Sequence, residues 1–158
     1  MAKKVNNVIR MLEQRKIEYQ AFELPAEKIG AREAAEILNV PPELVFKTIV
    51  VMRAVRGKPI LAVIPGDREA DLKKLAKEVG EKKVQLPTQR QAETLTGLQA
   101  GGISPLALIN KGFQVILDIK ARKYDQIYIS GGERGLNIRM APEDIAALTD
   151  GTFAPISQ

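Results

Sequence analysis

The sequence predicts an α+β fold: a single domain, residues 1–158, built around a mixed, mostly antiparallel sheet with flanking helices. The 158 residues are a usual length for one domain, and 45% of them are hydrophobic, which is enough to bury a core. Hairpin patterns occur at 45–65 and 126–140, where apolar, β-branched runs are joined by short glycine-containing turns. Helical and strand patterns do not alternate one for one, which argues against a doubly wound parallel sheet.

The helices are predicted from apolar residues spaced three and four apart, which form one stripe on a helix face. Val5, Val8 and Leu12 belong to such a stripe near the N-terminus. Glycines, prolines and capping residues set the ends; Gly80, for example, follows the last apolar position of its stripe. We expect helices over 4–16, 31–38, 72–79, 88–96 and 142–148, with a helical turn at 106–110.

Strands are predicted where apolar and polar residues alternate or where β-branched residues form short apolar runs. The hairpin at 45–65 has the most continuous apolar run, of the kind usually buried on both faces. We expect strands in both arms of this hairpin and over 17–24, 84–86, 115–119, 126–130, 136–140 and 152–156.

The composition narrows the available chemistry. The chain has no histidine and no cysteine, which excludes Ser-His-Asp triads, Cys-His nucleophiles and His-ligated zinc within it. Lysines, carboxylates, hydroxyls and backbone amides remain, and we expect neither a metal nor another cofactor. The lack of cysteine, of a signal-peptide pattern and of any apolar run near 18 residues predicts a cytoplasmic protein. The formal charge of +5 permits nucleic-acid binding without requiring it.

Lys47 stands at the start of the apolar hairpin and, by two-residue alternation, shares a face with Ile49 and Val51. Its ordinary interpretation is a strand-entry lysine whose stem covers apolar surface while its ammonium group stays in water. Its functional interpretation is a partly desolvated lysine that binds an anion or a carbonyl oxygen. From the residues alone, the ordinary interpretation is favoured.

Two Gly-Gly loops, at 101–102 and 131–132, are candidates for bringing backbone N–H groups together around a ligand. Neither matches a dinucleotide or phosphate-loop fingerprint, and an ordinary turn is favoured for either loop by itself. Asn137 stands alone among apolar residues, and a solvated strand position is favoured for it. The lysines within 73–83 are interpreted as the solvent-exposed face of an amphipathic helix, with a phosphate-contacting patch as the alternative.

Three motifs together carry a family resemblance. Phe-Lys-Thr at 46–48 enters the apolar strand, Gly-Gly-Ile-Ser-Pro occupies 101–105, and Ile-Ser-Gly-Gly-Glu-Arg-Gly-Leu occupies 129–136. In this order and at these separations they resemble the YbaK/EbsC family, small proteins related to the editing domain inserted in bacterial prolyl-tRNA synthetases. The resemblance covers nearly the whole chain. It implies a single α+β domain with a barrel-like mixed sheet, and a trans-editing aminoacyl-tRNA deacylase that typically removes cysteine or alanine from proline tRNA.

The resemblance also implies the site residues. Lys47 matches the key lysine of the family and is the candidate catalytic residue. The loop at 101–105 matches the family's G-x-x-x-P loop beside the scissile ester. The candidate substrate-binding residues are Gly101, Gly102, Ile103, Ser104, Pro105, Ser130, Gly131, Gly132 and Asn137.

This chemistry suits the composition, because an aminoacyl ester is already labile and needs no strong nucleophile. Backbone N–H groups of the loop at 101–102 would stabilise the developing oxyanion. Lys47 would hold the phosphate of the terminal adenosine or the ester carbonyl, as a positioner more than as a general base. Water, or a group on the substrate, would attack.

Two departures from the family pattern bear on which amino acid is accepted. Asn137 stands where the YbaK branch usually has an aspartate, and Leu24 and Ile29 lie where it tends to have an aromatic residue. Cys-tRNA(Pro) is the favoured substrate; the alternatives are Ala-tRNA(Pro), a lyase-type elimination, a non-catalytic module that binds tRNA or a synthetase, and a small-molecule pocket. The expected partners are the acceptor end of mischarged tRNA and prolyl-tRNA synthetase, with no membrane.

Overall fold

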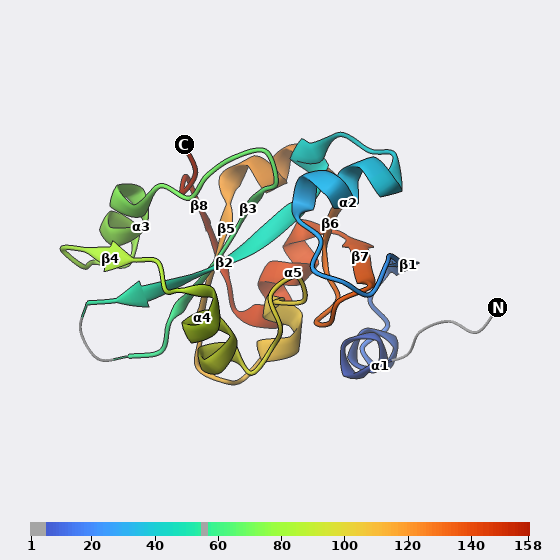
Figure 1. The fold of residues 1–158 in the computed structure, drawn as a ribbon, viewed down its shortest axis with the longest axis horizontal. Coiled ribbons are helices and arrows are strands. Elements are labelled where there is room, and N and C mark those ends of the chain that lie inside the picture. The colour runs from blue at the N-terminus through green and yellow to red at the C-terminus, as the bar shows by residue number, and fades with distance from the viewer. Residues whose placement is uncertain (1–5, 55–56) are drawn as a thin grey trace.

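The computed structural model describes residues 6–54 and 57–158 (Figure 1). Its α-helices are α1 (Asn7–Gln14), α2 (Ala31–Leu38), α3 (Leu72–Glu78), α4 (Gln89–Thr96) and α5 (Pro142–Thr149). Short 3-10 helices are η1 (Pro42–Leu44), η2 (Pro105–Leu108) and η3 (Ile119–Lys123). The strands are β1 (Tyr19–Glu23), β2 (Phe46–Arg53), β3 (Ile60–Pro65), β4 (Val84–Gln85), β5 (Gln114–Asp118), β6 (Ile127–Ser130), β7 (Leu136–Met140) and β8 (Thr152–Ala154).

Local chemistry explains where several helices begin and end. Helix α1 begins after Asn6, whose side-chain oxygen accepts the N–H of Ile9 at 2.9 Å; the expected start at residue 4 lies outside the described residues. Helix α4 begins with a capping box formed by Thr88 and Gln91 and ends at Gly97, which adopts φ 73°. The predicted helices are confirmed, and most ends agree within two residues.

The strands form a three-stranded sheet in the order β1-β7-β6 and a five-stranded sheet in the order β4-β2-β3-β5-β8. Four of the pairings are antiparallel, and the β3–β5 and β5–β8 pairings are parallel. The mixed, mostly antiparallel α+β fold is therefore confirmed. The barrel-like closure is only a loose description, because the sheets do not close on each other and β6 meets the larger sheet through the isolated bridge between Val45 and Tyr128.

Strand β2 is where the two sheets separate. On one edge it pairs with β3 over residues 46–51, while on its other edge Val45 bridges to Tyr128 and Met52 and Arg53 pair with β4. Between these contacts, within residues 6–54 and 57–158, that edge of β2 has no strand partner. The chain that links β1 to α2 passes across this opening (Figure 1).

Alternation along β2 places its side chains in different cores. Phe46 and Val50 belong to the larger core, which also contains α1 and α5, whereas Ile49 and Val51 pack in the smaller core under α3. Strand β3 is buried along its whole length, as the apolar run predicts. No helix in the described part of the chain is both long enough and apolar enough to cross a bilayer.

Candidate active site

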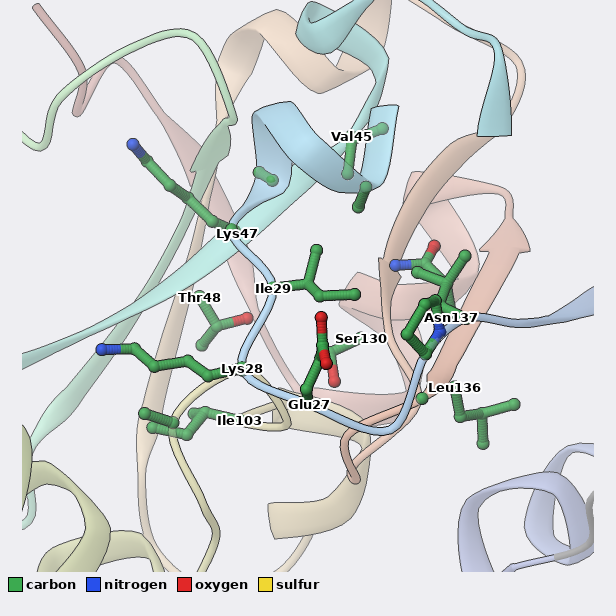
Figure 2. A pocket seen from close by; sticks show the side chains of 18 of the residues that line it. Glu27, Lys28, Ile29, Val45, Lys47, Thr48, Ile103, Ser130, Leu136 and Asn137 are labelled. Atoms are coloured by element: carbon green, nitrogen blue, oxygen red, sulfur yellow. The ribbon is translucent and has the colours of Figure 1, made fainter. Parts of the chain in front are cut away.

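A cavity of about 270 Å³ lies in the opening beside β2 (Figure 2). Four segments line it: the loop and helix start at 24–31 with Ala34, the start of β2 at 45–48, the glycine loop at 100–103, and the facing ends of β6 and β7 at 130 and 135–137. We call this cavity the β2 pocket. Most of its lining side chains are apolar or small, and the volume suits a small group better than a whole nucleotide.

Lys47 and Thr48 present different faces of β2 to the pocket. Figure 2 shows the Thr48 hydroxyl directed toward the cavity, whereas the ammonium group of Lys47 points away from its centre. Lys47 Nζ lies 3.8 Å from the largely exposed Glu69 carboxylate, and the lysine side chain is 26% exposed. Lys28 extends to the same side, and its Nζ donates a hydrogen bond to Gln89 Oε1. The pocket therefore has cations at its rim and not at its centre.

Gly101 provides a backbone N–H group at the pocket. Its φ of +89° is a left-handed conformation that glycine adopts without strain, and a Cβ there would lie 3.2 Å from Lys28 Cα. Gly102 is buried and does not line the cavity; its own N–H donates to the Gln99 carbonyl at 2.8 Å. A Cβ on Gly102 would lie 2.8 Å from backbone atoms of Glu133 and Arg134, so the two Gly-Gly loops pack directly against each other.

The second Gly-Gly loop uses its N–H groups internally. Gly131 donates to the Leu136 carbonyl at 2.9 Å, and Gly132 donates to Ser130 Oγ at 3.2 Å. Within the described chain, the N–H of Gly101 is thus the only one of the four candidate glycine donors without an acceptor. Ser130 itself lines the pocket beside that turn.

Asn137 is buried, with 7% of its surface exposed, so the predicted solvated position is wrong. It lies on the central strand of the smaller sheet, paired with Phe22 on β1 and Ser130 on β6, and the loop after β1 folds over it. The N–H of Leu24 holds that loop to the Gly135 carbonyl at 3.0 Å. Asn137 Oδ1 has no hydrogen-bond partner in the described structure, a state that usually costs about 1–3 kcal/mol.

The candidate residues therefore fall into two groups. Residues at the pocket are Lys47, Gly101, Ile103, Ser130 and Asn137. The others lie behind its wall: Ser104 is fully buried and caps η2 through the N–H of Leu106, Pro105 begins that helix, and Gly102, Gly131 and Gly132 pack between loops. Those residues shape the pocket without reaching the cavity.

Sequence reasoning missed Glu27 and Thr48, both of which line the pocket. Among the described residues that line the pocket, Glu27 is the only carboxylate, and Figure 2 shows it extending over the cavity. It lies on an irregular loop without a motif; the bracketing Pro25 and Gly30 mark the loop but say nothing about its contents. No three His, Cys, Asp or Glu side chains group as a metal site in the described residues.

Comparison with known proteins adds a family to this geometry. Residues 26–148 match the model of the aminoacyl-tRNA editing domain. EbsC of Enterococcus faecalis, named as a candidate Cys-tRNA(Pro)/Cys-tRNA(Cys) deacylase, is 41% identical over 153 residues, which cover 96% of this chain and 92% of EbsC. Proline–tRNA ligase of Thermodesulfovibrio yellowstonii is 30% identical over 74% of this chain, a match that covers 19% of the ligase.

Solved structures agree with the fold. A candidate trans-editing enzyme for prolyl-tRNA synthetase superimposes with a TM-score of 0.78 at 25% identity, covering 98% of this chain and 99% of that one. The hypothetical protein APE2540, at 23% identity, superimposes with a TM-score of 0.88 and covers 97% of this chain and 100% of its own. The resemblance read from the three motifs is confirmed, and the chain belongs to the family of aminoacyl-tRNA editing domains.

Proposed function

We propose that this protein is a trans-editing deacylase that hydrolyses the ester of mischarged tRNA, with Cys-tRNA(Pro) as its preferred substrate. The observation that carries the proposal is that one small cavity, in a chain of the editing-domain family, holds both a backbone N–H donor and a buried acceptor without a partner. Gly101 supplies the donor and Asn137 supplies the acceptor. An aminoacyl ester brings the complementary groups, a carbonyl oxygen and an α-ammonium.

In the proposed reaction, water adds to the ester carbonyl carbon and the bond to the ribose oxygen breaks. The Gly101 N–H donates to the carbonyl oxygen as negative charge develops on it. The proton lost by water goes to the ribose oxygen, which leaves free amino acid and a tRNA with a free hydroxyl. The hydroxyls of Thr48 and Ser130 are at hand to orient the water and the ribose. Neither histidine nor a thiol of the protein takes part in this route.

Asn137 is assigned to the α-ammonium group of the aminoacyl ester. Its Oδ1 is a buried acceptor, and a hydrogen bond from a charged donor contributes about 1.5–3 kcal/mol. The remaining walls include Ala31, Ala34 and Val45, which leave room for a small, weakly polar side chain. Cysteine meets this requirement, and the name of the E. faecalis relative mentions Cys-tRNA(Pro) and Cys-tRNA(Cys). Alanine is the alternative, because the same walls accept it.

Lys47 and Lys28 are assigned to the tRNA strand outside the pocket. Their ammonium groups lie at the rim, on the side away from Asn137 (Figure 2), where a phosphate next to the terminal adenosine would pass. Such a contact positions the ester and weakens as the salt concentration rises. The proposal places the protein in the cytoplasm with charged tRNA, and with prolyl-tRNA synthetase as partner. The editing domain then extends over residues 1–158, since α1 contributes Val8, Ile9 and Leu12 to the main core.

The test is a panel of tRNA(Pro) charged with Cys, Ala, Ser or Pro, together with Cys-tRNA(Cys), in which release of free amino acid is followed over many turnovers. We expect Cys-tRNA(Pro) to be cleaved fastest and Pro-tRNA(Pro) to be spared. Lys47→Ala should raise KM, whereas Lys123→Ala, which removes an exposed lysine on η3, should not. Retention of charged tRNA without turnover would instead identify a binding module, and cleavage of none of these substrates would exclude the proposal.

A further inference from the structure

We propose that Arg134 is a positioning residue that sets the direction and strength of the Gly101 N–H donor. This inference rests on the proposed function, because it assigns a role within the same site. Arg134 Nε donates a hydrogen bond to the Ala100 carbonyl at 2.7 Å. That carbonyl belongs to the same peptide unit as the Gly101 N–H, so the arginine holds the unit by its other end.

Peptide planarity turns this contact into control of the donor. In a trans peptide the C=O and the following N–H lie in one plane and point in opposite directions. Fixing the Ala100 oxygen on Arg134 therefore fixes the direction of the Gly101 N–H. The peptide unit before it is held as well, since the Ala100 N–H donates to Glu93 Oε2 at 2.8 Å. Without such restraints, the backbone freedom of glycine would let the plane rotate.

The turn that carries Arg134 is itself anchored. Asn6 Nδ2 donates to the Gly131 carbonyl and to Glu133 Oε1, both at 3.0 Å. The residue that caps α1 therefore holds this turn in place. Gly102 packs against the backbone of residues 133–134, at a distance that leaves no room for a Cβ. The second Gly-Gly loop therefore supplies no donor to the pocket. Instead it carries Arg134, which orients the N–H donor of the first loop.

The charge of Arg134 adds a second effect. A hydrogen bond from a guanidinium to a carbonyl oxygen is charge-assisted and polarises the peptide unit, which makes its N–H a stronger donor. This gain is largest when negative charge develops on the substrate, and smaller in the ground state. Loss of Arg134 should therefore lower kcat while leaving KM nearly unchanged. A smaller folded fraction would also lower the apparent kcat at an unchanged KM, so kcat is calculated per folded molecule, with the folded fraction of each variant measured by circular dichroism.

The experiment compares Arg134→Met and Arg134→Lys with the control Arg122→Met, which removes an exposed arginine of η3 that pairs with Glu143 of α5. With Cys-tRNA(Pro) we expect kcat of Arg134→Met to fall about 10- to 100-fold, less than the roughly 100- to 1,000-fold for losing an oxyanion donor outright. Arg134→Lys keeps the charge but not the planar fork, so it should recover part of kcat. Added guanidinium ions should restore part of the kcat of Arg134→Ala and none of that of Gly101→Ala.

A readout independent of turnover separates this inference from the proposed function. The amide NMR signal of Gly101 reports hydrogen bonding at the carbonyl of its own peptide unit, and should shift in Arg134→Met but not in Arg122→Met. If the wild-type protein cleaves no charged tRNA, the proposed function fails and the NMR comparison alone decides whether Arg134 orients the peptide. If Arg134→Met stays folded with an unchanged Gly101 signal, or with unchanged kcat in an active protein, the inference is overturned. If it does not fold, Arg134→Lys decides by the same two readouts.

Discussion

Replacing Asn137 by leucine should stabilise the free protein while impairing the reaction. Asn137 is buried on the central strand β7, and its Oδ1 has no hydrogen-bond partner in the described structure. Leucine is close in size and removes the polar atoms from a pocket wall that also contains the apolar residues Leu24 and Ile29. The same change removes the acceptor that we assign to the α-ammonium group. Stability and activity should therefore move in opposite directions.

The expected gain in stability and the expected loss in kcat/KM both follow from the burial of this one oxygen. An unpaired buried acceptor costs about 1–3 kcal/mol, of which we expect Asn137→Leu to recover about 1 kcal/mol after repacking. In a domain of this size, that corresponds to a rise in Tm of about 2–4 °C. The lost bond from a charged donor, about 1.5–3 kcal/mol, corresponds to a fall in kcat/KM of roughly 10- to 100-fold.

The assay combines the substitution with a change in the substrate. N-acetylation of the aminoacyl group removes the positive charge that Asn137 is expected to meet, so wild-type protein should cleave N-acetyl-Cys-tRNA(Pro) much more slowly than Cys-tRNA(Pro). In Asn137→Leu the two substrates should differ much less, because the buried acceptor is gone and only the weaker attraction of the Glu27 carboxylate remains. Asn137→Asp keeps an acceptor and should retain the preference for the free amine. A less stable Asn137→Leu protein that still discriminates as well as wild type would refute the assignment.

Three further changes test other parts of the site. Gly102→Ala should lower Tm by several degrees in thermal unfolding, since overpacking costs about 1–3 kcal/mol and a Cβ there would lie 2.8 Å from neighbouring backbone, whereas Gly30→Ala, with nothing within 4 Å, should change it little. Gly101→Ala, at φ +89°, should lower kcat about 10-fold or more in the deacylation assay by turning the donor, and an unchanged kcat would contradict the role of that N–H. Glu27→Gln should raise KM about 2- to 10-fold for Cys-tRNA(Pro) but not for its N-acetyl form, if the carboxylate attracts the α-ammonium; an equal effect on both substrates would exclude that explanation.

The fold was largely readable from the sequence because its signals are local. Caps such as Asn6 and Thr88 lie within four residues of the N–H groups they accept, and alternation along β2 placed Lys47 on the face of Ile49 and Val51. The openness of the sheet was not readable in this way. It depends on how β6 leaves β2 after the bridge at Val45, which is a long-range contact without a local pattern.

The motifs of the site could be predicted from the sequence, but their arrangement in space could not. Which glycine N–H remains available depends on how each turn closes: Gly102 donates to Gln99 and Gly132 donates to Ser130, and a Gly-Gly pair alone does not specify these turns. The burial of Asn137 depends on a loop that begins more than 100 positions earlier in the chain, at Leu24. Alternation assigns a residue to a face of a strand, but cannot say what covers that face.

The two Gly-Gly motifs look alike in the sequence and do different work in the fold. The first leaves one N–H, that of Gly101 at the pocket, without an acceptor in the described structure; the second uses both of its own to hold the turn that carries Arg134. Two polar groups without a partner in the described structure, the Gly101 N–H and Asn137 Oδ1, both belong to residues that line the β2 pocket. A second buried oxygen without a partner among the described residues belongs to Asp67, next to Gly66, which packs against the wall residues Val45 and Ala31. A fold that tolerates these costs beside one cavity keeps polar groups ready for a ligand that supplies both a donor and an acceptor, as an aminoacyl ester does.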